Sequence, residues 1–507
     1  MAKLNRRSFI QTSMASVGGL MLTPASAHAD GTLAQKSPGQ ESPVPDDIVV
    51  LADYCLKTAY DNLPSAVVAI TKNQILDTVG AALAGTNEPG AKEIREFTID
   101  MAGKREAAIW GTNIQVPAQD AARVNAIMAD ALDYDDTYER SFLHPSVITV
   151  PAALAVTDML GNVSGKDLIA ATALGVDLAC RLANSAQPGV DAFIVGWHNT
   201  SLYGYFASTF VAGKLMGLTR DQMVSALGIA FHQASGNSQA HLDGALTKRM
   251  GAGFASYAGV MAARLSKRGV QGAKNILEGP RGFYYQYHGN KYSRDFLFEG
   301  LGSTFAATDV SFKPWPSCRG SHTAVDAALT MFAENKIETS DVESITIYNG
   351  PGEYPLLDSP LSKKQNLTSV VDAQFSNPWI VTCALVDHKV GFEHFTTTAI
   401  KRPDLLAMVK RINTVEDQSL ERPGGGPGAT RLEVHLKDGR TFTKTSAYAK
   451  GGPKNPMSPI EFRQKFLDCT EKAGMSSAQA QALMVDIQQL ETLPNAKKLT
   501  TAMVLKP

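Results

Sequence analysis

The stretch that decides the fold is Ala121-Ala-Arg-Val-Asn-Ala-Ile-Met-Ala-Asp-Ala-Leu132, which runs directly into Asp133-Tyr-Asp-Asp-Thr137. Its first part carries apolar residues at a spacing of three to four, which predicts a helix with a buried face. The same spacing recurs over residues 70–83, 117–132, 165–183, 202–216, 220–234 and 252–267. Neither a βαβ alternation nor a GxGxxG motif occurs there. We therefore expect a large all-helical domain over residues 47–305, with Ala and Gly allowing close approach of its helices.

The pattern changes near Ala306. Residues 342–348 alternate as a strand, and residues 430–443 predict a hairpin around Lys437-Asp-Gly439. Helical patterns at 321–335 and 373–385 lie between them, so residues 306–452 are predicted to form a smaller α/β domain. Helical patterns return at 460–473 and 477–493, and we expect this closing segment, residues 453–507, to rejoin the first domain. The predicted fold class is therefore mainly α, with a large helical domain and a small α/β domain.

The acidic cluster after Leu132 is the first candidate site. Three aspartates, a threonine and His144 lie within twelve residues. If the helix continued, Asp133, Asp136 and Thr137 would share one face. Pro145 disfavours helical geometry at His144, which would leave the imidazole near a helix end, facing a cleft. The flanking segments are mostly apolar, so the acids need a reason to lie between them; an Asp-rich, solvent-exposed helix start is the alternative.

Composition limits the function classes. The 48 basic and 49 acidic residues argue against nucleic-acid binding, which normally needs a basic excess on one face. No run reaches the roughly 18 apolar residues of a membrane span. The five cysteines are odd in number and form no CxxC pair, which supports neither a disulfide framework nor a zinc site: Cys55, Cys180, Cys318, Cys383 and Cys469.

The N-terminus carries the features of an export signal. Asn5-Arg-Arg-Ser-Phe-Ile10 resembles a twin-arginine motif, an apolar stretch follows, and Ala27-His-Ala29 fits a cleavage site. We predict a signal peptide over residues 1–29, a linker over 30–46, and export of the folded protein to the periplasm. Removing residues 1–29, which hold three basic residues and no acid, changes the formal charge from −1 to −4. The alternative is a chance arginine pair in a disordered tail.

Short segments in a fixed order carry a family resemblance. They are Leu76-Asp-Thr-Val-Gly80, Asp133-Tyr-Asp-Asp-Thr137 with His144-Pro-Ser146, Gly196-Trp-His-Asn-Thr200, Leu246-Thr-Lys-Arg249, Leu277-Glu-Gly-Pro-Arg-Gly-Phe283, Lys313-Pro-Trp-Pro-Ser-Cys-Arg-Gly-Ser-His322, Asp372-Ala-Gln-Phe-Ser376 and Gly452-Pro-Lys-Asn-Pro456. With these segments the chain resembles the MmgE/PrpD family, which includes 2-methylcitrate dehydratase, cis-aconitate decarboxylase and iminodisuccinate epimerase. The resemblance implies a helical domain, a lid domain, a cleft between them and a homodimer. It also implies catalysis on small carboxylic acids with no metal and no organic cofactor.

The resemblance, together with the chemistry of Cys318 and Arg319, gives the candidate site residues. The expected catalytic residues are Asp133, Thr137, His144, His198 and Cys318. The expected substrate-binding residues are Lys248, Lys313, Arg319 and His322. Lysine and arginine hold carboxylates by charge-assisted hydrogen bonds, and histidine suits proton transfer near neutral pH. Without the family pattern, Lys248 could instead be a solvated helix start and His198 a capping or core histidine, and His241 could line the same cleft.

Several positions depart from the family pattern. Cys318 stands where cis-aconitate decarboxylase has a histidine, Gly251 where relatives often carry His or Gln, and Trp379 where they often carry Tyr. The segment from Asp133 to His144 carries one extra residue compared with cis-aconitate decarboxylase. These differences argue against a straightforward cis-aconitate decarboxylase. Cys318 itself is interpreted either as a small buried apolar residue or as a thiol acid or base.

The sequence therefore predicts an exported, cofactor-independent lyase, a dehydratase or decarboxylase of a small di- or tricarboxylic acid. An epimerase on the same scaffold is the near alternative, and a non-catalytic periplasmic carboxylate-binding protein is the distant one. Acid and base residues opposite the lysines favour an enzyme, since a binding protein would not need them. A homodimer is the expected assembly, with neither nucleic acid nor, after signal cleavage, a membrane as partner.

Overall fold

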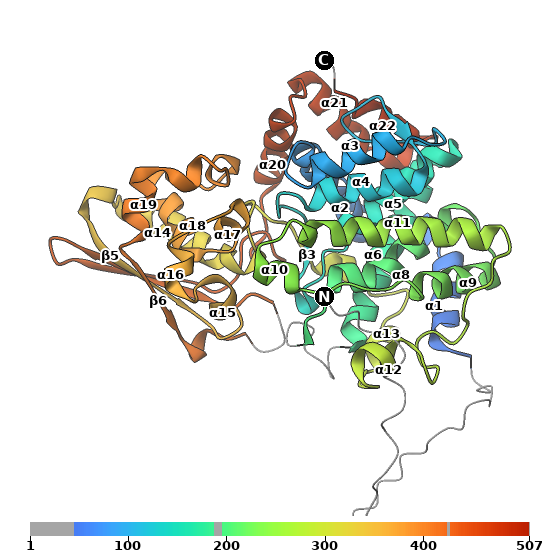
Figure 1. The fold of residues 1–507 in the computed structure, drawn as a ribbon, viewed down its shortest axis with the longest axis horizontal. Helices are drawn as coiled ribbons and strands as arrows, with labels where there is room; N and C mark the ends of the chain where they lie inside the picture. The colour runs from blue at the N-terminus through green and yellow to red at the C-terminus, as the bar shows by residue number, and fades with distance from the viewer. Residues whose placement is uncertain (1–44, 187–194, 423–425, 506–507) are drawn as a thin grey trace, which may run out of the picture. The chain divides into compact units, whose positions relative to one another are not determined.

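The computed structural model describes residues 45–186, 195–422 and 426–505. The predicted signal peptide, residues 1–29, and all but the last two residues of the predicted linker lie outside the described residues. The described chain divides into a helical part and a part built around a sheet (Figure 1).

Long helices form the first part, and each of the six helical segments predicted there matches one of them, with overhangs of at most three residues. They are α1 (Asp47–Lys57), α2 (Ser65–Gly85), α3 (Ala91–Met101), α4 (Ala118–Asp130), α5 (Ser146–Leu160), α6 (Gly165–Ala186), α8 (Asn199–Leu215), α9 (Arg220–Phe231) and α11 (Thr247–Lys267). Shorter elements are β1 (Ala107–Ala108), β2 (Gln115–Val116), α10 (Gln239–Asp243), α12 (Phe283–His288) and α13 (Asp295–Phe298). By length and hydropathy α6 could cross a membrane, but its apolar window is entirely buried in the protein. Its buried Asp177 and Arg181 pair with each other at 2.8 Å.

Small residues bring α11 close to its neighbours, as the composition of the helix faces predicted. A Cβ added at Gly251 would lie 2.0 Å from Ser201 Oγ of α8. One added at Gly253 would lie 2.4 Å from Ile127 of α4, and one at Gly259 2.0 Å from Ser208 of α8. None of these separations can accommodate a side chain, so glycine sets the distance between α11 and the two helices it packs against.

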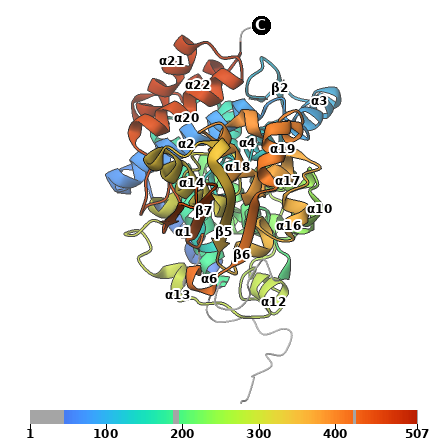
Figure 2. The same cartoon turned by 90° about the vertical axis from the view of Figure 1, so that its left-hand side faces the viewer.

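The second part is built around a four-stranded sheet in the order β6-β5-β7-β8. In Figure 2 this part of the chain faces the viewer. The predicted strand and hairpin are β5 (Val342–Asn349), β7 (Thr430–Leu436) and β8 (Thr441–Ser446). The sequence did not predict β6 (Ile412–Glu416), which pairs parallel with β5. Helices α14 (His322–Asn335) and α18 (Asn377–Val386) contribute to the core under the sheet, with α19 (Pro403–Val409) beside α18. Shorter helices are α15 (Tyr354–Leu357), α16 (Leu361–Lys364) and α17 (Val370–Gln374).

The closing helices are α20 (Pro459–Lys472), α21 (Ser477–Gln488) and α22 (Lys497–Ala502). Their apolar side chains, including Phe466, Leu483 and Leu499, belong to the same hydrophobic core as α1 to α11. Residues 324–436 form a second core of their own. The chain therefore leaves the helical core near Val310 and returns to it near Phe466.

The predicted helix through the acidic cluster is wrong. Helix α4 ends at Asp130, and Asp133 takes a left-handed conformation with a φ of 52°. Asp tolerates this conformation better than most residues, and it turns the chain sharply. The chain then extends, so that Thr137–Tyr138 (β3) pairs antiparallel with Val310–Ser311 (β4). The side chains after Asp130 consequently point in directions that helical spacing does not give.

Candidate active site

A cavity of about 970 Å³ is lined by both parts of the chain. Eight of the nine predicted site residues line it: Asp133, Thr137, His144, His198, Lys248, Lys313, Cys318 and Arg319. His241, which the sequence left open, lines it too. These residues are separated by up to 186 positions in the chain, and the fold brings them to one place.

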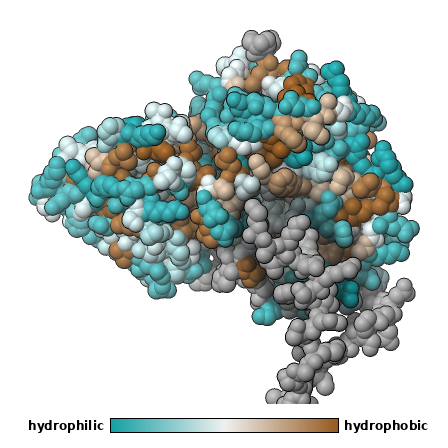
Figure 3. All heavy atoms as spheres, in the orientation of Figure 1, coloured by the Kyte–Doolittle hydropathy of each residue, from teal (hydrophilic) through white to brown (hydrophobic). Residues whose placement is uncertain are grey.

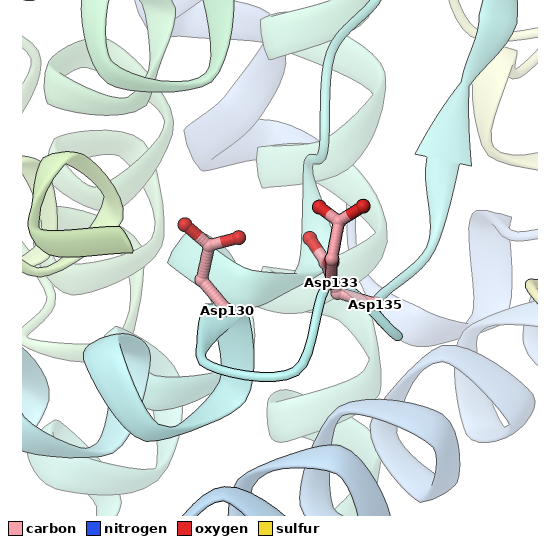
Figure 4. Close-up of side chains that lie close together, drawn as sticks. All are labelled: Asp130, Asp133 and Asp135. Carbon is pink, nitrogen blue, oxygen red and sulfur yellow. The ribbon is translucent and has the colours of Figure 1, made fainter. Parts of the chain in front are cut away.

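The centre of the site is a cluster of buried carboxylates and lysines. Asp130 ends α4, while Asp133 and Asp135 stand on the loop that follows (Figure 4), and their ligand atoms lie within 4.8 Å of one another. Lys248 Nζ, from the first turn of α11, donates to Asp130 Oδ1 and Asp133 Oδ1 at 2.8 Å each. Lys313 Nζ donates to the Asp133 carbonyl at 3.0 Å and lies 3.4 Å from the carboxylates of Asp133 and Asp135. The ammonium groups thus hold the acids together.

Charge compensation fixes the protonation of this cluster. Burial alone would raise the pKa of Asp133, but Lys248 and Lys313 outweigh it and hold that pKa well below its usual range. Burial lowers the pKa of both lysines, yet the surrounding aspartates outweigh it and raise the lysine pKa values above normal. Both lysines therefore remain cations at neutral pH. The predicted binding of substrate by Lys248 and Lys313 stays a prediction, and each lysine already contacts aspartate.

His144 is oriented from behind by Asp135, which the sequence did not single out. His144 Nδ1 lies 3.1 Å from Asp135 Oδ2, 2.7 Å from the Asp136 carbonyl and 3.2 Å from Thr137 Oγ1. Nδ1 is therefore the protonated nitrogen toward the protein, and Nε2 remains for the cavity. Burial lowers the pKa of His144, but the Asp135 charge outweighs it and raises the pKa above its ordinary value.

The Asp136 side chain points away from the cluster of Asp130, Asp133 and Asp135. Its carboxylate accepts from the Ser146 backbone N–H at 3.1 Å and from the Ser146 hydroxyl, at the start of α5. Burial raises the Asp136 pKa to about 7. The helix predicted over this segment would have placed Asp136 beside Asp133, whereas the turn at Asp133 sends Asp135 to the site instead.

The pKa values of His198 and His241 are lowered, in contrast to the raised pKa of His144. His198 precedes α8, and its Nδ1 lies 2.9 Å from Ser201 Oγ; its ring packs edge-on against that of His241, with centroids 4.9 Å apart. Burial lowers the His198 pKa well below normal, and the nearby His241 and Lys248 add to the effect. Burial lowers the His241 pKa to about 4. Burial therefore favours the neutral form of both rings, whereas the Asp135 charge favours the cationic form of His144.

Gly251 explains the packing at His198. The Cβ that any other residue would carry there lies 2.0 Å from Ser201 Oγ and 3.3 Å from His198 Nδ1. The Ser201 hydroxyl thus takes up the space of a side chain at position 251. Trp379, another departure from the family pattern, is fully buried in the second core, and its Nε1–H donates to the His394 carbonyl at 3.2 Å.

Cys318 and Arg319 line the cavity, but His322 does not. Burial raises the pKa of the Cys318 thiol to about 11, so it stays protonated at neutral pH. Arg319 pairs with Glu139 at 2.6 Å and donates to the carbonyls of Ala449 and Lys450. His322 is fully buried behind Arg319, with Nδ1 3.0 Å from the guanidinium. Direct substrate contact by His322 was therefore a wrong prediction, since it backs Arg319 instead.

The cavity also carries charged residues that the sequence did not single out. Arg140 lies over the Phe296 ring at 4.7 Å, and Arg422 lies over Tyr448 at 4.6 Å. Within the described residues neither arginine forms an ion pair with a carboxylate. Glu353 accepts from the Gly428 N–H at 3.1 Å, and burial raises its pKa to about 7. No local sequence motif marks these residues, so their position at the site follows only from the cavity in the folded structure.

The three clustered aspartates resemble a ligand set for a hard cation, which prefers carboxylate oxygens. Lys248 Nζ, however, already bridges two of them at 2.8 Å, where an incoming dication would meet a like charge. The donor set therefore suits an ammonium group better than a metal ion.

Two family models match the chain. The MmgE/PrpD N-terminal domain covers residues 49–295, and the MmgE/PrpD C-terminal domain covers residues 315–490. Cis-aconitate decarboxylase of Aspergillus terreus is 26% identical over 80% of this chain and 86% of its own length. The human cis-aconitate decarboxylase is 27% identical over 87% and 91%, and 2-methylcitrate dehydratase of Escherichia coli strain K12 is 26% identical over 78% and 83%. Because family models match both of its parts and its relatives are named decarboxylase and dehydratase, the chain belongs to the MmgE/PrpD family.

Proposed function

We propose that the protein is a lyase, a dehydratase or decarboxylase, that acts on a small di- or tricarboxylic acid by proton transfer next to a carboxylate. Family membership and relatives named decarboxylase and dehydratase support the lyase class. One observation carries the proposal: histidines with opposite shifts in pKa face a single cavity beside two buried lysines. Such opposed shifts are what an acid and a base working at one pH require.

His198 is the proposed base and His144 the proposed acid. In a dehydration, neutral His198 takes the proton from the carbon next to the carboxylate. The hydroxyl group then leaves as water with a proton from His144 Nε2. In a decarboxylation, the carbon that releases CO₂ takes the His144 proton. His241, also neutral, stands beside His198 as a second acceptor.

Asp133 and Thr137 act through their neighbours in this scheme. Asp133 holds both lysines, while Thr137 Oγ1 lies 3.2 Å from His144 Nδ1. Cys318, with its protonated thiol, is at most a proton donor and not a nucleophile at neutral pH.

Substrate carboxylates are proposed to meet cations at two places. Lys248 uses two of its three N–H groups on Asp130 and Asp133, which leaves one for the cavity. A cation there would stabilise the charge that develops when a proton leaves the neighbouring carbon. Arg140 and Arg422 are the second place, since they line the cavity and pair with no carboxylate among the described residues.

We further propose that turnover needs no metal or organic cofactor, that the mature protein works in the periplasm, and that it forms a homodimer. Large apolar side chains exposed on α3, α10 and α11 and at the residue before α11 support the dimer: Phe97, Met101, Leu242, Phe254 and Leu246. Figure 3 shows such apolar patches between polar side chains over the helical elements. Light scattering of the mature protein would test the dimer, and a monomer at micromolar concentration would rule it out.

A proton-NMR screen in deuterated water tests the reaction. The mature protein is incubated with citrate-like and tartrate-like acids, and we expect one of them to lose water or CO₂ and to take up solvent deuterium. His198→Ala should abolish the exchange, while His435→Ala, on strand β7, serves as the matched control. Deuterium uptake with inversion and no net conversion would favour the epimerase. An acid that binds but neither exchanges nor converts would favour the binding protein and overturn the lyase.

A further inference from the structure

The segment Leu76-Asp-Thr-Val-Gly80 on α2 has no place in the site described so far. It faces α20 of the closing segment. A Cβ added at Gly80 would lie 3.1 Å from the Phe466 ring, so glycine admits this helix. Asp77 pairs with Lys465 of α20 at 2.5 Å, and both side chains are almost completely buried.

Lys465 also reaches the loop that carries the site acids. Its Nζ donates to the Tyr134 carbonyl at 2.8 Å and lies 4.1 Å above the Tyr134 ring. Tyr134 stands between Asp133 and Asp135, and its hydroxyl donates to the Pro314 carbonyl at 2.9 Å, next to Lys313. A buried ammonium from the end of the chain therefore supports the loop from the side away from the cavity.

We propose that Lys465 and Asp77 are a positioning ion pair that holds the Asp133–Asp135 loop and sets the electrostatic environment of His144 through Asp135. The role of this pair in catalysis rests on the proposed function. A pH titration of His144 tests the pair without any measurement of activity.

The physical reason is that the pair is neutral only while both partners are present. Removal of one partner leaves an uncompensated buried charge, which destabilises the fold and changes the field at neighbouring groups. The Asp77 charge interacts with Asp135 and with Lys313. The charged and titratable groups that face His144 come from several elements: Asp130, Asp133, Asp135, Lys248, Lys313, His198 and His241.

The variants Asp77→Asn and Lys465→Met change this field in different ways. Asp77→Asn leaves the buried Lys465 ammonium unbalanced, so the cationic form of His144 becomes less favourable. We expect its pKa to fall by about one unit, within the usual effect of a nearby charge. Lys465→Met leaves Asp77, which can take up a proton, so the His144 pKa should stay or rise. The double variant carries an uncharged pair and should restore the wild-type value.

The measurement is a pH titration of the His144 ring by NMR of histidine-labelled protein, with the signal assigned by its loss in His144→Ala. The pH profile of kcat/KM is recorded alongside, and its alkaline limb should move with the titration. Lys465→Arg, which preserves the charge, should titrate as wild type. The same His144 pKa in folded Asp77→Asn as in wild type, or a fall in Lys465→Met, would overturn the proposal. If wild type shows the titration behaviour but no turnover, only the proposed function fails.

Discussion

At the scale of single residues, the Asp135–His144 contact makes a prediction about pH dependence. The active form needs neutral His198 and cationic His144. Activity should therefore be lost as pH falls through the lowered His198 pKa and as it rises through the raised His144 pKa. Asp135→Asn removes the charge that raises the His144 pKa. We expect the alkaline limb of kcat/KM to move down by about one to three pH units.

The matched control for this change is Asp387→Asn. In the wild type the Asp387 carboxylate lies 2.8 Å from His394 Nε2, in the second core region and away from the cavity. That variant should leave the profile in place. An unchanged alkaline limb in a folded Asp135→Asn protein would show that His144 is not the group that must be protonated.

The carboxylate cluster carries a second prediction at this scale. Because Lys248 occupies the position between Asp130 and Asp133, we expect activity to survive EDTA and exhaustive dialysis unchanged. In Lys248→Met the three carboxylates lose that partner, and calorimetry should detect Mg²⁺ or Ca²⁺ binding to this variant only. Loss of wild-type activity on chelation, restored by a divalent ion, would contradict this account.

Most of the residues that the sequence predicted for the site line the cavity, but their contacts were not predicted. Motif positions led to His144, His198 and both lysines, since these lie in the short segments that carried the family resemblance. Asp135 was missed because helical spacing was assumed past Leu132, whereas the left-handed Asp133 redirects the chain. Asp130 is the last residue of α4, and no motif singled it out. The sequence did not predict that His322 is buried behind Arg319, because a motif does not say on which side of Arg319 the ring lies.

At the scale of elements, the closest approach of α11 to α8 carries a prediction. Gly251→Ala would push a methyl group into Ser201 Oγ and so move His198, whose Nδ1 that hydroxyl contacts. We expect kcat to fall about tenfold or more, with little change in KM, since a misoriented base costs rate more than binding. The measurement is steady-state kinetics on the single variants and the double variant.

A double-mutant cycle shows whether the effect passes through Ser201. Ser201→Ala loses only the contact with His198, and adding Gly251→Ala to it should cost little more, because the hydroxyl in the way is gone. Additive losses would mean that Gly251 acts on something other than Ser201.

Long periodic elements were predictable, and short or capped ones were not. Each predicted helix of the first part is present, because a buried stripe repeated over three or more turns leaves little alternative. Strand β6 has only five residues and depends on β5 for its hydrogen bonds, so its own pattern is weak. The single helix predicted over 373–385 is instead two, since the Ser376 side chain accepts from Trp379 N–H and starts α18 anew.

At the scale of the whole molecule, one core depends on both ends of the described chain. Ile48 of α1 and Leu499 of α22 belong to the same hydrophobic cluster, and Lys465 of α20 is paired with Asp77 of α2. The helical core can therefore be completed only after the last helices have been synthesised. The sequence led to this arrangement through the return of helical periodicity after residue 456, although the Asp77–Lys465 pair could not be predicted from it.

This dependence on both ends bears on export. A chain whose core closes last with its C-terminal helices suits a pathway that carries folded proteins, which is the pathway the Arg6-Arg7 motif indicates. The described cysteines are all free, so folding before export needs no oxidising compartment. We expect replacement of both arginines by lysine to leave the precursor in the cytoplasm, measured by cell fractionation and immunoblotting. Lys3→Arg, which keeps the pair intact, should be exported as wild type. Arrival of the double-lysine form in the periplasm of cells with a working twin-arginine system would show that another route exports this protein.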